Sequence, residues 1–231
     1  MGIPYIPGLS AEEWAGATFD QRLESLKALE SAMASQENRT PATVIASEGM
    51  KPNERGYFNR FDNEIGINPS LIGSDQPYQA VETTFHEDQH AHQHFCVQHP
   101  EQAKEDPAVL NDWRMSEQDG YTHYDGTNFS EYRFQPTELD ANQAARGRTD
   151  EFYEKTMQDT QKYPEFKQMK EQEVSDDVAR AKGELGENYV EEARQTMQIN
   201  YLEAQGQQES GQPAPGEDNE ESKKQGYGYG Y

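Results

Sequence analysis

Residues 77–97 read PYQAVETTFHEDQHAHQHFCV, and this stretch decides which fold the rest of the chain must support. Tyr78, Val81 and Phe85 recur at helical spacing. An apolar residue at every third or fourth position is typical of a helix with one buried face. We therefore predict an amphipathic helix over 77–97.

The same stretch contains an HExxH motif, His86-Glu-Asp-Gln-His90. Histidines four residues apart lie on one face of a helix, about one turn from each other. Two imidazoles so placed can occupy two corners of a tetrahedral zinc site. Glu87 follows the first histidine, so its carboxylate can take a proton from a metal-bound water. The alternative is a solvated His-rich face that binds metal loosely, because most histidines of the chain lie in one tract: His86, His90, His92, His94 and His99.

A third ligand is predicted in the segment 131–145, which should form a second helix. Pro136 suits the first turn of a helix, where its missing N–H costs nothing. Glu138 follows in that turn, and Asn142 lies one turn later on the same face. We predict that Glu138 binds the metal and that the Asn142 amide orients a ligand histidine. The alternatives are that Glu138 only complements the helix dipole, or that Asp140, about 200° away around the helix, is the ligand instead.

The other residues of the tract that could bind a metal are predicted to lie outside the site. His94 lies on the same face of the helix as the two motif histidines. It is too far along the helix axis to bind the same ion, so we expect it at the rim of the site. His92 points in another direction. Cys96, the single cysteine, stands where the long HExxHxxGxxH motif has its third histidine. Gln93 replaces the turn-making glycine of that motif, so we reject this variant and expect Cys96 to be a small, partly buried apolar residue.

Residues 120–126 are rich in turn formers and supply candidates for a group that stabilises an oxyanion. These are Tyr121, His123 and Tyr124, together with Tyr132. Most tyrosines only pack. We favour Tyr132 as the catalytic one because it closely precedes the predicted ligand helix.

Taken together, the HExxH motif and the later Glu138-Leu-Asp-Ala-Asn142 segment resemble the zincin metallopeptidases, in the branch with a glutamate ligand (gluzincin-like). Asn142 stands where the second motif usually has aspartate. The order of features is similar to that of the small zincin domains of bacterial toxin and effector proteins. A hairpin over 56–68 comes first, a helix with the sequence Thr-x-His-Glu follows, and the segment Tyr-Arg-Phe-Gln-Pro-Thr-Glu-Leu-Asp-Ala comes last. The resemblance covers about residues 42–148.

This resemblance implies an α+β fold: a zincin-like domain with a small antiparallel sheet, the HExxH helix, a second ligand helix and a helical C-terminal extension. It implies one zinc ion bound by His86, His90 and Glu138. It also implies peptide-bond hydrolysis with Glu87 as general base, an endopeptidase being favoured over an exopeptidase. The substrate is then a protein or peptide, and a cognate inhibitor or an export partner is a further expected partner.

Two residues depart from the zincin pattern. Asp88 lies inside the motif, where zincins usually avoid charge, and His92 stands where they usually have an apolar residue. These departures predict either a shallow, open cleft or a motif that binds metal without catalysis.

The composition limits the other functions open to the chain. Of its 231 residues 32% are hydrophobic, and the mean hydropathy is −1.13, which indicates a modest core with long solvated helices. The net charge is −23. Binding to nucleic acid or to anionic membranes is disfavoured, because both need clustered Lys or Arg. We also expect no membrane span and no conventional signal peptide, so the protein is cytoplasmic or exported by a dedicated route.

Four regions are predicted along the chain. Residues 1–40 form a helical segment, with capping boxes at Ser10–Glu13 and Thr18–Gln21. Residues 41–150 form the zincin-like core, with a β-rich run at 42–47 and strands at 57–61 and 64–68 around an Asp62-Asn63 turn. Residues 151–204 form two or three helices packed on the core, separated near Pro164. Residues 205–231 form a disordered tail rich in Gly, Gln and Tyr.

A zinc metallopeptidase is the function that these features favour. The first alternative is a zinc-stabilised, non-catalytic binding module, with His94, His92 or Cys96 as a fourth protein ligand. The second is an acidic helical interaction protein whose histidine tract is accidental, which predicts no stoichiometric metal.

Overall fold

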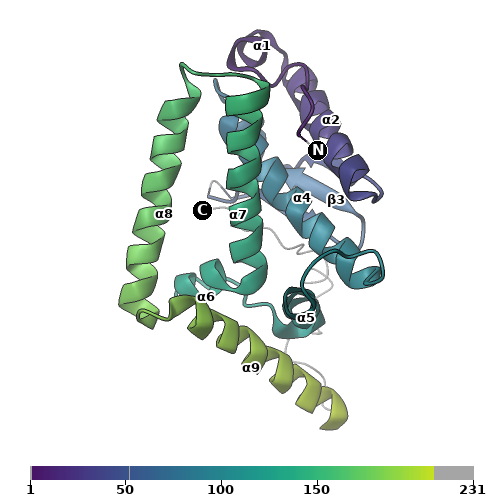
Figure 1. Cartoon of the computed structure of the whole chain (residues 1–231), viewed down its shortest axis with the longest axis vertical. Coiled ribbons are helices and arrows are strands. Elements are labelled where there is room, and N and C mark those ends of the chain that lie inside the picture. The colour runs from purple at the N-terminus through teal and green to yellow at the C-terminus, as the bar shows by residue number, and fades with distance from the viewer. Residues whose placement is uncertain (1, 52, 211–231) are drawn as a thin grey trace. The chain divides into compact units, whose positions relative to one another are not determined.

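The computed structural model describes residues 2–51 and 53–210 (Figure 1). The chain is about 65% helical and has a three-stranded sheet, so the predicted α+β class is confirmed. The described residues form two compact units. One comprises the residues up to His92 together with Ala141–Lys170, and the other comprises Gln93–Asp140 and the residues from Glu171 onward.

Two capped helices open the first unit: α1 (Ala11–Gly16) and α2 (Phe19–Glu37). The capping box predicted at Thr18 is present, because its side chain accepts from Gln21 N–H while the Gln21 side chain accepts from Thr18 N–H. Ser10 caps α1 as well, because its hydroxyl accepts from Glu13 N–H. The Glu13 carboxylate accepts from Gly8 N–H and from the hydroxyls of Tyr5 and Ser10.

The sheet has the strand order β1-β3-β2, formed by β1 (Thr43–Ala46), β2 (Gly56–Asn59) and β3 (Glu64–Ile67). β2 and β3 are antiparallel, as predicted for the hairpin, but the connecting turn spans residues 60–63 rather than two residues. β1 and β3 are parallel, so the prediction of a wholly antiparallel sheet is wrong. β3 lies at the centre, and its Ile65 and Ile67 side chains are fully buried.

The short helix α3 (Pro69–Ile72) leads to α4 (Tyr78–Gln98), which confirms the helix predicted for the motif. Tyr78, Val81 and Phe85 are all buried, as their spacing predicts. They share one hydrophobic cluster with the sheet and with apolar residues of the N-terminal segment, Ile3, Ile6, Leu9 and Trp14. The cluster also includes Phe152 and Tyr153 of the π-helical turn η2 (Phe152–Thr156), so one face of α4 packs into the core of the first unit.

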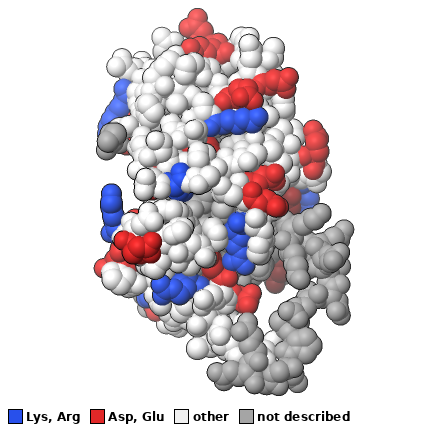
Figure 2. All heavy atoms as spheres, turned by 90° about the vertical axis from the view of Figure 1, so that its right-hand side faces the viewer, with Lys and Arg blue, Asp and Glu red and all other residues white. Residues whose placement is uncertain are grey.

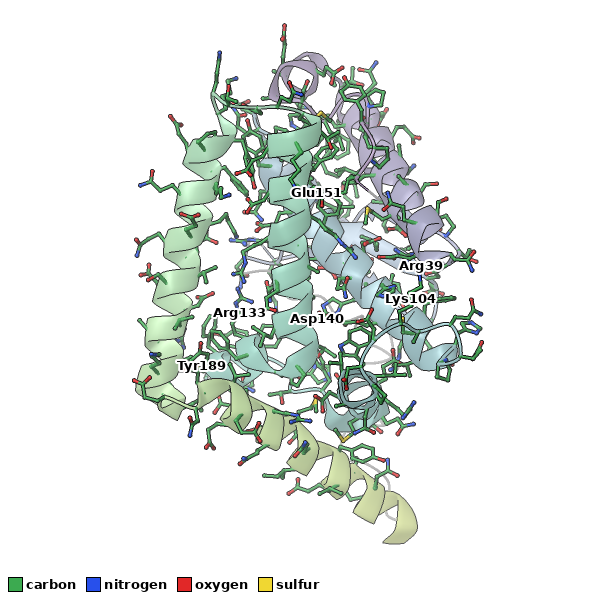
Figure 3. The ribbon with its side chains drawn as sticks, viewed as in Figure 1. Arg39, Lys104, Arg133, Asp140, Glu151 and Tyr189 are labelled. Atoms are coloured by element: carbon green, nitrogen blue, oxygen red, sulfur yellow. The ribbon has the colours of Figure 1, made fainter. Side chains whose placement is uncertain are left out.

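The second unit contains α5 (Pro107–Met115), the π-helical turn η1 (Ser116–Gly120), α6 (Phe129–Phe134) and α9 (Tyr189–Ser210). α9 packs along η1 and α6. Tyr189, labelled at the start of α9 in Figure 3, places its ring 4.8 Å from that of Phe134 on α6. A bridge from Arg133 on α6 to Asp177 ties this helix to α8 (Tyr163–Leu185).

The helix predicted for the third ligand is also present, as α7 (Pro136–Glu151). Pro164 lies in the first turn of α8, and Gly186, with φ of 86°, ends that helix before α9. The tail predicted from 205 onward lies mostly outside the described residues, although α9 continues to Ser210. Among the described residues no helix is long and apolar enough to span a membrane.

The charged surface is mixed in sign where it can be seen. The face in Figure 2 carries acidic and basic side chains interspersed among uncharged ones, without a broad patch of either sign. The net charge of −23 is therefore not gathered on this face.

Candidate metal centre

The two motif histidines lie against each other on α4. Their Nε2 atoms are 3.2 Å apart, and their ring centroids are 4.8 Å apart. Two nitrogens on one tetrahedral zinc ion stand about 3.3 Å apart, because each Zn–N bond is about 2.0–2.1 Å long. His90 is buried and His86 is half-buried. The pair therefore has the spacing that a shared metal ion requires.

The predicted third ligand is one of the most deeply buried carboxylates, since Glu138 is only 1% exposed. The Tyr121 hydroxyl donates to its Oε1 atom at 2.6 Å, and the Tyr132 hydroxyl lies 3.4 Å from its Oε2 atom. Two hydroxyl contacts on a buried carboxylate fix its rotamer, which suits a metal ligand.

The structure brings the three predicted ligands together. The potential ligand atoms of His86, His90 and Glu138 all lie within 4.8 Å of one another. No other group of three or more such side chains occurs within residues 2–51 and 53–210. Two imidazole nitrogens and one carboxylate oxygen form a donor set that suits zinc and leaves the fourth tetrahedral position to water or substrate. This group could hold a metal ion.

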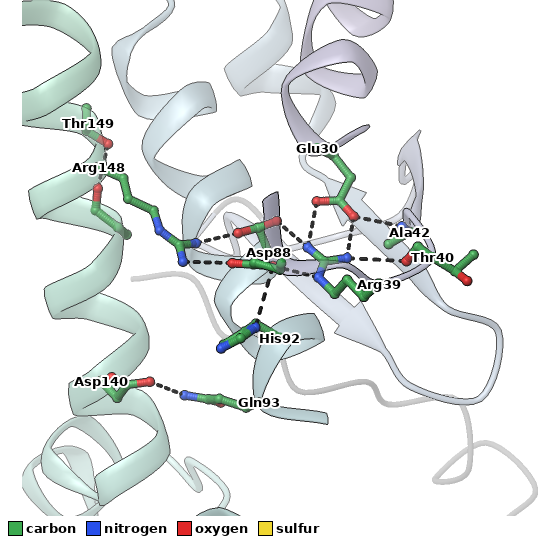
Figure 4. Close-up of polar contacts among 12 residues, drawn as sticks. Glu30, Arg39, Thr40, Ala42, Asp88, His92, Gln93, Asp140, Arg148 and Thr149 are labelled. Atoms are coloured by element: carbon green, nitrogen blue, oxygen red, sulfur yellow. Dashed lines mark hydrogen bonds and ion pairs between the residues drawn. The ribbon is translucent and has the colours of Figure 1, made fainter. Parts of the chain in front are cut away.

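Asp140, the competing ligand, is held by a different partner. Gln93 donates to the Asp140 carboxylate at 2.7 Å and to the Thr137 carbonyl at 3.0 Å (Figure 4). Its amide therefore attaches α4 to the first turn of α7 at two points, one on each side of Glu138. The Asp140 side chain is turned to this amide, and Glu138 belongs to the group that could hold a metal ion.

The three possible fourth ligands also lie elsewhere. His92 faces Glu37, with Nδ1 3.7 Å from a carboxylate oxygen, and the Nδ1 of His94 is 2.9 Å from Glu117. Cys96 is buried in a small hydrophobic cluster with Leu110 and Trp113, as predicted for an apolar role. The role predicted for Asn142 in orienting a ligand histidine remains a prediction.

Glu87 lies beside the edge strand β2. Its side chain is only 2% exposed. A Cβ atom placed on Gly56 of β2 would lie 3.1 Å from Glu87 Oε1 and 2.7 Å from Thr83 Cγ2. Since β2 forms an outer edge of the sheet, the motif glutamate stands next to a strand that pairs on one side only.

Asp88, the departure from the zincin pattern, is the most buried residue of the motif, with no exposed surface. Arg39 donates to one of its carboxylate oxygens and Arg148, from α7, donates to the other (Figure 4). Both arginines also contact Glu37, at 2.7 and 2.9 Å. Asp88 is therefore buried and paired with two arginines, and the depth of the cleft stays a prediction. The charge lies on the core side of the helix.

The surroundings raise the pKa of both Asp88 and Arg39. Burial and the carboxylate of Glu37 raise the pKa of the Asp88 carboxyl well above its ordinary value, although the guanidinium of Arg39 acts in the opposite direction. Burial alone would lower the pKa of Arg39, but the hydrogen bond to Glu30 and the charge of Asp88 raise it above its ordinary value.

The segment that carries Tyr121 is held by a buried amide. Gln135 accepts from Thr122 N–H and donates to the Thr122 carbonyl, both at 2.9 Å, so it pairs with this residue as a neighbouring strand would. Tyr121 directly follows η1, where the backbone is kinked at Gln118 and Asp119. His123 and Tyr124 are exposed. Sequence reasoning favoured Tyr132, and the shorter contact to Glu138 belongs to Tyr121.

No protein-family model matches the chain, and comparisons with curated proteins and with solved structures found no significant match. The resemblance to zincins therefore depends on the motif residues and their geometry alone.

Proposed function

We propose that the protein is a zinc-dependent metallopeptidase with a zincin-like core, in which His86, His90 and Glu138 bind one zinc ion. The observation that carries this proposal is the three-membered donor group, with the carboxylate of Glu87 next to one of its ligands in the chain. A purely structural zinc site is normally closed by four protein ligands. Within the described residues this group has three, and His92, His94 and Cys96 have other neighbours.

The protein side of the reaction follows from these positions. Zinc held by His86, His90 and Glu138 would polarise the scissile carbonyl and make an attacking water more acidic. Glu87 would accept a proton from the attacking water and pass it to the leaving amine. Burial of Glu87 strengthens these proton transfers, because few water molecules compete for its carboxylate. Tyr132, whose contact with Glu138 is the longer of the two tyrosine contacts, would turn its hydroxyl to donate a hydrogen bond to the oxyanion.

We infer that the substrate is a protein or peptide bound in an extended form along β2. The outer edge of this strand presents N–H and C=O groups that an extended chain can pair with. Gly56 brings this edge close to Glu87, because it has no side chain to intervene. The geometry suits cleavage within a chain, which favours an endopeptidase.

The first test is the zinc content of untagged full-length protein, determined by elemental analysis. We expect about one zinc per chain in the wild type and a clear loss in Glu138→Ala. Asp140→Ala is the matched control and should keep its zinc, because Gln93 holds that side chain. If the wild-type protein contains no zinc, the result favours the alternative of an acidic interaction protein whose histidine tract is accidental.

The second test separates catalysis from metal binding. Glu87→Gln should keep its zinc and lose turnover of a denatured protein substrate by on the order of 10²-fold or more, because the amide cannot accept the proton. Near-normal turnover in this variant would rule out the proposed general base. Zinc in both proteins without turnover in either would instead favour the non-catalytic binding module.

A further inference from the structure

Asp88 belongs to a closed ring of charges, in which Asp88 and Arg39 are buried and Glu37 and Arg148 are half-buried. Asp88, Arg39, Glu37 and Arg148 alternate in sign, and each contacts the next. Glu30 extends the ring on one side, since it binds Arg39 at 2.8 and 3.2 Å and accepts from Ala42 N–H at 2.7 Å. The ring therefore ties α2, the start of β1, α4 and α7 together.

The ring faces the side of α4 that is opposite to the metal ligands. At about 100° per residue, Asp88 points about 180° away from the direction midway between His86 and His90. Figure 4 shows Arg39 and Arg148 approaching Asp88 from opposite sides. Two contacts from opposite sides leave the helix little freedom to roll about its own axis. Any roll would change the direction in which the two histidines project.

Stability alone does not account for such a ring. Removing several charges from water costs free energy that their mutual attraction often only offsets, and apolar residues of similar volume frequently serve stability as well or better. Hydrogen-bonded charges are directional, however, whereas apolar contacts tolerate small rotations. The side chains of Asp88 and Arg39 are 0% and 2% exposed, so their geometry is not loosened by solvent.

We propose that Asp88 is a positioning residue, which sets the roll of α4 through its ring of charges and thereby aims His86 and His90 at the metal. This inference rests on the proposed zinc site and names the device that preorganises it. Residues that orient metal ligands without touching the ion typically change metal affinity about 10–100-fold when they are replaced.

The test compares Arg148→Gln with Arg194→Gln in the full-length protein. Both arginines join a helix to a buried aspartate, but Arg194 pairs with Asp112 on α5, away from the ring. We expect Arg148→Gln to weaken zinc affinity about tenfold, measured by competition with a chromophoric chelator. It should also shift the visible spectrum of the Co²⁺-substituted protein. Arg194→Gln should change neither, even if both variants melt at a lower temperature.

A second pair of variants guards against a purely structural effect. Arg148→Lys keeps the charge but only one point of contact, so it should recover part of the affinity. Asp88→Asn should lose more than Arg148→Gln. If it does not fold, Arg148→Gln decides the matter, since Arg39 still holds Asp88 there. Wild-type zinc affinity and an unchanged Co²⁺ spectrum in folded Arg148→Gln would overturn the inference.

The outcomes also distinguish this inference from the proposed function. A wild-type protein that binds zinc but cleaves no peptide refutes the peptidase, while the affinity series still decides the role of Asp88. A wild-type protein that binds no zinc overturns both.

Discussion

At the scale of single residues, small differences in side-chain position separate the candidate ligand from its neighbours. Glu138 and Asp140 lie two residues apart on one helix. The first accepts hydroxyl hydrogen bonds from tyrosines, and the second accepts an amide hydrogen bond from Gln93. The sequence predicts that only one of them can face the metal, because they point in different directions. The hydrogen-bond partners of the two carboxylates indicate that Glu138 is the candidate ligand.

Tyr121 should matter more to the metal than Tyr132, because its contact with Glu138 is 2.6 Å rather than 3.4 Å long. We expect Tyr121→Phe to weaken zinc affinity about tenfold and Tyr132→Phe to weaken it less, since the shorter hydrogen bond orients the carboxylate more strongly. Chelator competition on the two variants measures the difference. Equal losses, or a larger loss in Tyr132→Phe, would contradict this order.

Gly56 should be sensitive to a single methyl group. In Gly56→Ala the new Cβ would press on Thr83 and on the Glu87 carboxylate, at the 2.7 and 3.1 Å given by the present backbone. We expect turnover to fall more than tenfold, while zinc content is unchanged, because the methyl group displaces the general base and not the ligands. Gly183→Ala is the control. Its Cβ would meet nothing within 4 Å, so it should keep full turnover and gain about 0.5–1 kcal/mol of helix stability.

At the scale of helices and strands, α4 combines the site residues with their supports. His86 and His90 project from one side, and Asp88 projects from the opposite side into the ring of charges. Gln93, one turn after His90, binds the first turn of α7. One helix therefore carries two of the proposed ligands, the proposed general base and the residues that anchor the helix, so its position should affect every part of the candidate site.

Replacing the Gln93 amide tests the contact between α4 and α7. In Gln93→Glu the carboxylate can no longer donate to the Thr137 carbonyl, and it repels Asp140. We expect a loss of about 1–3 kcal/mol in the free energy of unfolding, because buried polar groups are left without partners. Urea titration measures it. Gln143→Glu, at an exposed position of α7, should change stability by less than about 0.5 kcal/mol. A similar loss in both variants would show that Gln93 has no special role.

The sequence predicts these helices well, but it does not predict the long-range contacts that hold them in place. Periodicity and caps locate α2, α4 and α7 within a few residues, because these signals are local. The ring around Asp88 depends on residues far apart in the chain, Arg39 and Arg148 among them, and no local pattern pairs them. The one signal for this ring in the sequence was Asp88 itself, a charged residue on the side of the helix opposite the histidines. The parallel pairing of β1 was missed for the same reason, since a contact between distant strands leaves no periodic trace.

At the scale of the whole molecule, stability depends on buried polar contacts as well as on the apolar core. Tyr78, Tyr153 and Tyr163 pack their rings together, with centroids 4.8–5.5 Å apart. The Tyr78 hydroxyl donates to Asp159, beyond the end of η2. This contact links the start of the motif helix to the loop before α8.

That contact predicts how stability varies with pH. Burial alone would raise the pKa of Asp159, but the Tyr78 hydroxyl and the N–H groups of Gln161 and Lys162 favour its charged form and lower it. A carboxyl with a lowered pKa stabilises the fold above its unfolded pKa of about 4 and loses that contribution as the pH falls further. Asp159→Asn should therefore cost about 1 kcal/mol at pH 7 and less below pH 4.

Urea unfolding at pH 7 and at pH 3 measures this difference. Asp176→Asn is the control, because Asp176 is exposed on α8, and it should have a small effect at both values. A cost for Asp159→Asn that does not diminish in acid would show that the charge of Asp159 is not what stabilises the protein.

The burial of Ile3, Ile6 and Leu9 affects when the core can form during synthesis of the chain. The Tyr153 hydroxyl donates to the Leu9 carbonyl, and Thr156 donates to the Ile3 carbonyl, across 144 and 153 positions of sequence. At about 5–20 residues per second, a ribosome takes roughly 7–30 s to reach these partners after making the first segment. For that interval Ile3, Ile6 and Leu9 lack the last members of their hydrophobic cluster, Phe152 and Tyr153. We therefore expect the core of the first unit to close only late in synthesis.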